Sequence, residues 1–446
     1  MYTTTIGRTF LKAYNERFNT SYTAKTFFEE IFIPLFFDHP KYMMPARNSP
    51  LENPKLSWVD MIKGKKPFEI PERRKERITK MIHKIETEKA DSSIAIGYGV
   101  LDEATVTASQ ITSIDFPDNK EYIYLSWIGA GLGIGVAGGV IILFDQPELL
   151  LDIYDGWNYY RQYLEKNPLM KGNQINTWNG QWIAHRYDEY DFDKDDPIAG
   201  LNPLEKTNEG LFNIPTIIWT KILFGIARHF NGNNLVGYLY NIGQTNTTIG
   251  FIPFLLEDIN RPNLFYKKIF GVDDYKQNIK QIEDLYGTAF GIRAACQYGS
   301  IGVQALEPKG LRTFIPTEKG SKKITYKEND DTHRITFNTY LIWILAMLNN
   351  EKLWEESQKI AKQLLAYEAG AGKARKDRTN NVNQLLDSTG SRQFLQNMIP
   401  IIEDEVKDRK DSSSYEELGK MINVIPKDNF PYFNTLIRFQ YALLNK

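Results

Sequence analysis

The stretch LSWIGAGLGIGVAGGVIILF, residues 125–144, decides how the middle of this chain folds. It has no charged residue and six glycines. Three structures are compatible with it: a membrane-spanning helix, a phosphate-binding glycine loop, or two buried strands joined by a tight connection. Each alternative leads to a different class of function.

A membrane helix is the first alternative. The run is long enough to cross about 30 Å of hydrocarbon, and its glycines recur at the GxxxG spacing of helix pairs. However, each glycine costs a helix roughly 1 kcal/mol relative to alanine. No basic residues flank the run, and Asp145 and Glu148 follow it closely. We therefore do not favour a membrane span, and we expect no membrane contact.

A dinucleotide-binding loop is the second alternative, because Gly133, Gly135 and Gly138 spell GxGxxG. That motif has meaning only between a strand and the helix whose N-terminus receives the pyrophosphate. Here the next residues are VIILF, which predict a strand instead. The sequence therefore predicts no cofactor at this position.

Two strands, about 122–128 and 139–144, form the alternative that we favour. Both YIYLSWI and VIILF are rich in aromatic and β-branched residues. Glycines between them would permit a positive φ angle or a close backbone approach. We expect this segment to be the central hairpin of an α/β core.

The composition is that of a globular chain with two or three domains: 446 residues, 24% charged, with a net charge of -1. Nucleic acid or acidic lipid would therefore have to bind at local patches. One cysteine and five dispersed histidines argue against a metal centre built from those residues. The N-terminal residues lack a secretory pattern, so we expect a cytoplasmic protein.

The pattern along the chain predicts an α+β protein. Residues 1–331 are expected to form a mixed α/β domain with a central β-sheet, which includes strands at 93–101 and 106–116. A polar loop is expected at 240–251. Residues 332–446 show apolar residues every three to four positions, which predicts a C-terminal helical bundle of four or five helices.

Two basic stretches are candidates for phosphate contacts. Residues 63–89 hold ten Lys or Arg and five acids, and Pro71 is placed to begin a helix there. A solvated surface helix and a nucleic-acid contact are both compatible with that stretch. The second stretch interrupts the bundle near residue 375. The candidate phosphate-binding residues are Lys63, Lys65, Lys66, Arg73, Arg74, Lys75, Lys373, Arg375, Lys376 and Arg378.

Two polar stretches are candidates for reading bases. One is GNQINTWNGQWIAHRY at 172–187, where Asn and Gln amides alternate with indole rings. Such groups suit base edges and base faces, but they also suit buried hydrogen-bonded turns. The other is the proline-rich loop at 39–58. The candidate residues are Asn48, Ser49, Lys55, Asn173, Gln174, Asn179 and Gln181.

Catalytic motifs of hydrolases, P-loop proteins, zinc proteases and dithiol enzymes are absent from the sequence. A metal nuclease would place Asp and Glu-x-Lys on adjacent strands. Glu405 and Lys407 have that spacing, but the pattern around them predicts a helix. We therefore favour a non-catalytic protein, and a Mg²⁺-dependent restriction-type defence nuclease is the alternative.

The layout of the chain resembles the large subunit of a type I CRISPR surveillance complex (Cascade). The stretches that carry this resemblance are AKTFFEEIFIPLFFDHPKYM with NSP at 48–50, GNQINTWNGQW, and DNFPYFNTLIRFQYA at 428–442. No site residue is transferred from that family. Some members carry a cysteine-rich zinc module, which this chain with its one cysteine lacks.

The resemblance implies a protein of antiviral defence that binds DNA and RNA. Its N-terminal domain would read a short motif on duplex target DNA and separate the strands, and the bundle would hold an unwound strand. Guide RNA and the other Cascade subunits would be its partners, and pairing with the guide would supply the remaining specificity.

Overall fold

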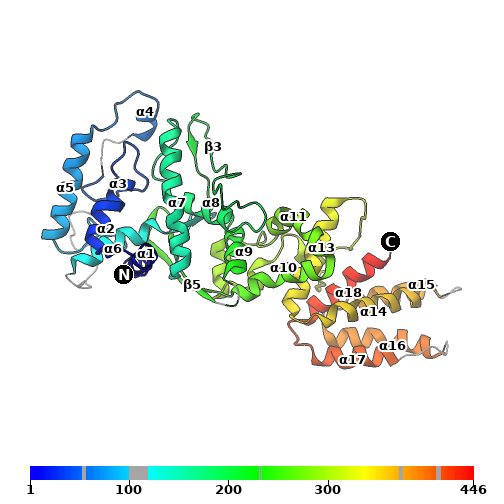
Figure 1. Ribbon diagram of the computed structural model, residues 1–446. Coiled ribbons are helices and arrows are strands. Elements are labelled where there is room, and N and C mark those ends of the chain that lie inside the picture. The colour runs from blue at the N-terminus through cyan, green and yellow to red at the C-terminus, as the bar shows by residue number, and fades with distance from the viewer. Residues whose placement is uncertain are drawn as a thin grey trace. The chain divides into compact units, whose positions relative to one another are not determined.

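The computed structural model describes residues 1–52, 57–99, 119–230, 232, 234–370, 375–407 and 413–445. The chain forms two compact units. Unit 1 comprises Met1–Leu256 and Ile292–Ile301, and unit 2 comprises Glu257–Gly291 and Gly302–Lys446. The predicted α+β class is confirmed, because unit 1 combines helices with a small sheet and unit 2 is built from helices (Figure 1).

Unit 1 is organised around a four-stranded antiparallel sheet with the order β1-β2-β5-β6. Its strands are β1 (Ile134–Val136), β2 (Val140–Phe144), β5 (Leu235–Asn241) and β6 (Gln244–Phe254), and a separate pair is formed by β3 (Glu205–Lys206) and β4 (Phe212–Asn213). Its helices are α1 (Tyr2–Phe18), α2 (Ala24–Phe27), a π-helical turn (Phe28–Phe32), α3 (Ile33–Phe36), α4 (Trp58–Ile62), α5 (Pro71–Thr87), α6 (Lys120–Gly131), α7 (Pro147–Lys166), α8 (Ile175–Arg186), α9 (Trp219–His229) and α12 (Ile292–Ala295).

The expected strand at 122–128 is wrong, because these residues lie in helix α6. The side chain of Asn119 caps this helix by accepting a hydrogen bond from the backbone N–H of Glu121. Nearly every residue from Ile123 onwards is buried. A helix that is buried on all sides has no polar face, so it lacks the period by which helices are found in a sequence.

The rest of the opening stretch does form a hairpin, with β1 as its first strand and β2 as its second. The expected strand VIILF is confirmed as β2, and all five of its residues are buried. Gly138 and Gly139 form the turn with φ angles of 97° and 69°, which side chains disfavour. β2 also pairs with β5, which places it inside the sheet.

Glycines also allow α1 and α6 to pack closely. A Cβ atom on Gly129 would lie 1.9 Å from the carbonyl oxygen of Thr3, and one on Gly7 would lie 2.1 Å from that of Leu125. No side chain fits at either position. The glycines of the opening stretch therefore serve both helix packing and a turn.

Two other expectations in unit 1 are corrected. The expected polar loop at 240–251 is a hairpin, in which Asn241 of β5 pairs with Gln244 of β6. The described part of the strand expected at 93–101, residues 93–99, contains turns and a bend and no strand. Ile94 and Ile96 are buried there, and their backbone carbonyls accept hydrogen bonds from the Trp127 indole and the Thr3 hydroxyl. The whole strand expected at 106–116 lies outside the described residues.

Unit 2 is helical, as expected for the C-terminal region. Its helices are α10 (Leu256–Phe270, whose first residue belongs to unit 1), α11 (Val272–Leu285), α13 (Asp331–Leu348), α14 (Lys352–Glu368), α15 (Arg375–Leu386), α16 (Ser391–Lys407), α17 (Ser413–Val424) and α18 (Phe430–Leu444). Six of these helices follow residue 330 in the described part of the chain, where four or five were expected. The boundary expected at 331/332 lies inside unit 2.

Candidate nucleic-acid interface

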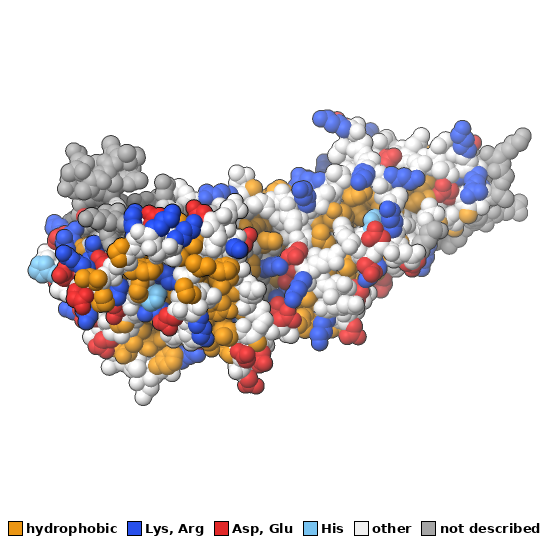
Figure 2. Space-filling model, turned by 90° about the horizontal axis from the view of Figure 1, so that it is seen from above, with side chains coloured by type: hydrophobic (Ala, Val, Ile, Leu, Met, Phe, Trp, Pro, Cys, Tyr) orange, Lys and Arg blue, Asp and Glu red, His pale blue; other side chains and the backbone are white. Residues whose placement is uncertain are grey.

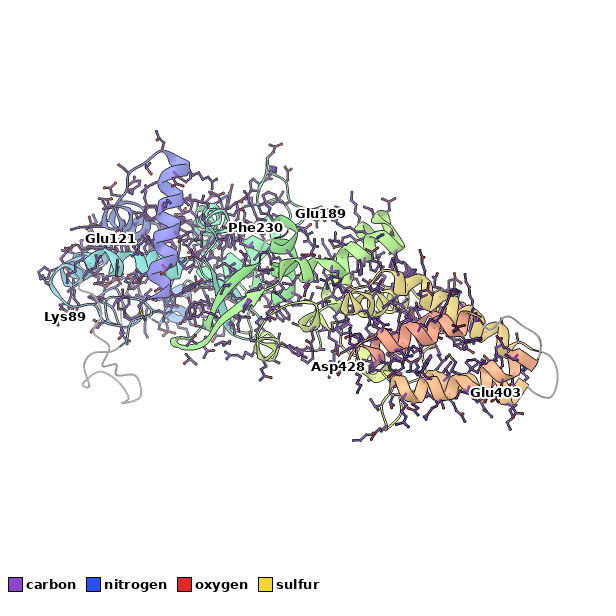
Figure 3. All side chains as sticks on the ribbon, turned by 90° about the horizontal axis from the view of Figure 1, so that it is seen from below. Lys89, Glu121, Glu189, Phe230, Glu403 and Asp428 are labelled. Atoms are coloured by element: carbon purple, nitrogen blue, oxygen red, sulfur yellow. The ribbon has the colours of Figure 1, made fainter. Side chains whose placement is uncertain are left out.

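Helix α5 carries the densest basic stretch of unit 1. It begins at Pro71, as predicted, because proline lacks the N–H that the first turn of a helix leaves unpaired. Met81 and Ile85 are buried on its inner side. The opposite side is charged, and Lys89 lies just past the C-terminal end of the helix (Figure 3).

Four cations of α5 form one stripe. Arg73, Arg77, Lys80 and Lys84 follow one another at intervals of four, three and four residues, which places them on one side of a helix. All four line a groove of about 700 Å³ opposite the turn that contains Asn48. The other residues that line this groove, which we call the α5 groove, are Ser49, Pro50, Glu52, Glu76, His83 and Glu88.

The turn opposite α5 is shaped by Ser49. The Ser49 hydroxyl donates to the carbonyl of Ala46 at 2.6 Å and accepts from the backbone N–H of Leu51 at 3.2 Å. Its side chain is buried, so it has a structural role here. Asn48 is exposed and is therefore the residue of this turn that can offer an amide to a ligand.

Carboxylates neutralise most of the cationic stripe. Arg73 pairs with Glu76 at 3.2 Å and Lys84 pairs with Glu88 at 3.2 Å. Arg77 pairs with the largely buried Glu69 at 2.6 Å. Lys80, by contrast, has no ion-pair partner among the residues that the structure describes.

Glu52 forms part of the groove wall, where burial raises the pKa of its carboxyl group and the charge of Arg77 opposes that rise. The groove thus holds a mixed set of charges with a small excess of cations. Figure 2 likewise shows Lys and Arg side chains next to Asp and Glu side chains at this end of unit 1.

The remaining candidates around α5 divide into exposed and anchored side chains. Lys63, Lys65 and Lys75 are exposed and form no ion pair within the described residues. Lys66 pairs with Asp60 at 2.9 Å, and this hydrogen bond holds the pKa of Asp60 below its usual value. Lys55 lies outside the described residues.

Arg74 differs from its neighbours on α5. Its side chain is buried, and it pairs with Asp38 at 3.2 Å and with the carbonyl of Glu69. Arg74 therefore attaches α5 to the loops beneath it and has no surface to offer a phosphate in this structure.

The amides of α8 are bound to main-chain groups. Asn179 is fully buried, and its Nδ2 donates to the carbonyls of Gly131 and Gly133 at 2.8 and 2.9 Å. Gly131 is the last residue of α6, where a helix leaves its own acceptors unpaired, and Gly133 lies two residues beyond it. Gln181 donates to the carbonyl of Pro215 at 2.9 Å.

The amides just before α8 are used in the same way. Gln174 donates to the carbonyl of Lys171 and accepts from the backbone N–H of Ile214 at 2.6 Å. Asn173 has a positive φ of 59°, and its amide fits between the carbonyl of Met44 and the indole N–H of Trp58. The structure thus agrees with the second of the two interpretations of this stretch, namely buried hydrogen-bonded turns.

The basic candidates near residue 375 belong to unit 2. Arg375 and Lys376 are exposed in the first turn of α15. Arg378 lies over the ring of Tyr367 at 5.2 Å and donates to the Tyr367 carbonyl at 3.2 Å. Lys373 lies outside the described residues.

Sequence reasoning missed three cations and one histidine of the α5 groove, namely Arg77, Lys80, Lys84 and His83. A signal for them was present, because the spacing of the four cations is that of a single helical stripe. What the sequence does not give is the turn at residue 48 on the other side of the groove.

The structure offers no specific support for the other two functions considered. Among the described residues, no group of three or more His, Cys, Asp or Glu side chains is arranged to hold a metal ion. Glu405 lies on helix α16, as its sequence pattern indicates. In the described part of the chain, no helix combines the length and the apolar character that a membrane crossing needs.

Comparisons with protein-family models, with curated proteins and with solved structures give no match to this chain.

Proposed function

We propose that this protein is a non-catalytic nucleic-acid-binding subunit that contacts duplex target DNA at the α5 groove. The supporting observation is the stripe of Arg73, Arg77, Lys80 and Lys84 on one side of α5, opposite the exposed amide of Asn48. The groove combines cations for phosphates with a side chain that can donate to or accept from a base edge.

The finer part of the proposal follows from the resemblance to the Cascade large subunit. In that setting the subunit reads a short motif on the duplex and holds the unwound strands, while guide RNA and the other subunits complete the complex. Partial neutralisation of the stripe fits a subunit that binds DNA weakly alone, because few phosphates would gain a new cation.

The test compares two lysine pairs in the full chain. We expect K80Q/K84Q, which changes the two lysines of the groove, to weaken binding to a fluorescent duplex and to reduce the slope of log Kd against log salt by about 2, since each phosphate contact contributes about 0.9. K166Q/K194Q is the matched control, because it removes two exposed lysines of unit 1 that lie outside the groove.

Equal salt slopes for the two variants would rule out the α5 groove as the contact. A pull-down that asks whether RNA co-purifies with the chain tests the finer proposal, and an RNA-free preparation from the native host counts against it. Incubation of the same duplex with Mg²⁺ tests the non-catalytic part, which cleavage by the pure chain would contradict.

A further inference from the structure

In unit 2, a long segment without helix or strand joins a short 3₁₀ turn (Leu311–Phe314) to α13. This segment, residues 315–329, is here called the strap. Long structureless loops in compact units are uncommon, and those that are ordered often carry function. The described contacts show that this one is ordered and also indicate what it presents.

The strap is fixed by hydrogen bonds at both of its ends. The backbone N–H of Lys322 donates to the carbonyl of Thr313 at 2.8 Å, and Gly320 closes a turn with Thr317 at 2.8 Å. Near the other end, the ring of His333 contacts the carbonyl of Thr325 at 3.0 Å. The strap thus has a defined path although it has no secondary structure.

A buried arginine of α18 supports the first half of the strap. Arg438 is 8% exposed, and its guanidinium donates to the carbonyls of Phe314 and Lys322. Its carboxylate partner in the described structure is Asp387 at 3.7 Å, whose side chain is mostly exposed. The positive charge of Arg438 is therefore only weakly compensated by its surroundings.

The strap itself is rich in uncompensated cations. Lys319, Lys322, Lys323 and Lys327 are exposed, and none of the four forms an ion pair with a described residue. The ammonium group of Lys322 lies over the ring of Phe314, 5.5 Å from its centroid. The acids within the strap are Glu318 and Glu328.

The nearest acids of α13 are already in use. Asp330 caps the helix by accepting from the backbone N–H of His333, and Asp331 pairs with Arg334 at 3.5 Å. The cations of the strap therefore face solvent with fewer carboxylates beside them than the stripe of α5 has.

We propose that the strap binds the phosphate backbone of a nucleic-acid strand, as a second contact surface that lies in unit 2. The inference rests on the proposed function for the identity of the polyanion, but it uses none of the residues of the α5 groove. Lysines on flexible stems can follow the phosphates of an irregular strand as point charges.

A nucleic acid fits the strap better than an acidic membrane surface does. Proteins that lie on membranes combine basic residues with exposed large apolar side chains that enter the lipid. The exposed large apolar residues of the described chain include none from the strap. The strap thus presents charge without a group that would insert into lipid.

The first experiment removes three of the lysines. In the full chain, K319Q/K323Q/K327Q should weaken binding to a fluorescent single-stranded oligonucleotide. The slope of log Kd against log salt should fall by about 2, since each contact with a single strand contributes about 0.7. K352Q/K362Q/K427Q is the matched control, because it changes the net charge equally and alters exposed lysines of unit 2 outside the strap.

Equal slopes for the two triple variants would overturn the proposal. A strap variant that loses binding to vesicles of phosphatidylcholine and phosphatidylserine, but keeps binding to the oligonucleotide, would overturn it in favour of a membrane contact. If K80Q/K84Q has no effect while the strap variant lowers the slope, the α5 groove fails and the strap stands. If the groove variant lowers the slope while the strap variant does not, the strap proposal fails and the α5 groove stands.

A second experiment tests Arg438 as a positioning residue. R438Q should speed trypsin cleavage within the strap and weaken oligonucleotide binding, because the strap backbone loses its fixed path. The salt slope should stay unchanged, because the lysines that contact the phosphates remain. R438K should restore part of the resistance to trypsin and part of the oligonucleotide binding. An unchanged cleavage rate in a folded R438Q chain would show that the arginine does not hold the strap, and a changed slope would show that it binds phosphate directly.

Discussion

At the scale of single residues, Gly129 shows how one missing side chain sets the distance between two helices. Its Cα faces the backbone of α1 so closely that a Cβ would lie 1.9 Å from the carbonyl oxygen of Thr3. That oxygen belongs to a helix backbone and cannot rotate away as a flexible side chain would. The two helices would have to separate to admit a methyl group.

We therefore expect Gly129→Ala to lower the free energy of unfolding by about 3 kcal/mol, the upper part of the range for overpacked cores. Gly243→Ala is the control, because a Cβ there would meet no atom within 4 Å. Urea unfolding followed by tryptophan fluorescence measures both. Equal midpoints for the two variants would mean that α1 and α6 can separate at little cost.

His39 is the residue whose environment predicts a pH dependence. Burial lowers its pKa from 6.5 to about 4, and the backbone N–H of Lys41 contacts its Nδ1 at 3.0 Å. Between these two pKa values the unfolded chain binds the proton and the folded chain does not. Stability must therefore fall as the pH decreases from about 6.5 to about 4.

His39→Asn should remove this component. From pH 7 to pH 5, the wild type should lose about 1 kcal/mol more of its unfolding free energy than the variant does. This value is reduced for the partial exposure of the ring. Denaturant unfolding at the two pH values measures it. His83→Asn, which removes an exposed histidine, is the control. A difference that stays constant with pH would contradict the assignment.

At the scale of elements, the amides of α8 complete α6. Helix α6 ends at Gly131, where its last carbonyls have no partners within the helix. Asn179 and Asn176 donate to carbonyls at this end. The sequence stretch that resembled a base-reading surface thus stabilises the junction between a buried helix and the sheet.

Asn179→Ala should therefore lower stability by about 2 kcal/mol, because the buried carbonyl of Gly131 loses this donor and that of Gly133 keeps Asn176 alone. It should leave the affinity for duplex DNA unchanged under conditions where the protein is folded. Asn48→Ala at the exposed turn should lower the affinity for duplex DNA and leave the stability unchanged. A thermal melt and an anisotropy titration of both variants separate the two roles, and a loss of affinity in folded N179A would return this amide to the list of base-reading candidates.

At the scale of the whole molecule, the chain passes between the two compact units three times, at residues 256–257, 291–292 and 301–302. Helix α11 packs against α13, which follows the strap. The indole N–H of Trp343 in α13 donates to the carbonyl of Val303 at 2.9 Å. Residues on both sides of position 331 thus build one core.

A fragment of residues 1–331 should consequently leave α10 and α11 without the partner that covers them. We expect it to bind the dye ANS and to associate at micromolar concentration, since its apolar side chains stay exposed. Sedimentation velocity of the fragment and of the full chain measures this. A monomeric fragment with a cooperative unfolding transition would instead support a domain boundary at 331/332.

Several features of the fold follow from local sequence. Pro71 and the charges after it indicate α5, the run VIILF indicates a buried strand, and the three-to-four-residue period after residue 332 indicates helices. In each case the signal lies within one element. The same reasoning places Lys80 and Arg77 on one side of α5, although they were not among the candidates.

What the sequence alone determined is the fold class, the start of α5, the strand at 140–144 and the helical C-terminal region, because periodicity and proline act over a few residues. Only the tertiary structure decided that residues 120–131 form a helix, that the α8 amides bind backbone carbonyls, and that the turn at Asn48 faces α5. These outcomes depend on contacts between segments far apart in the chain, and such contacts leave no periodic signal in either segment alone.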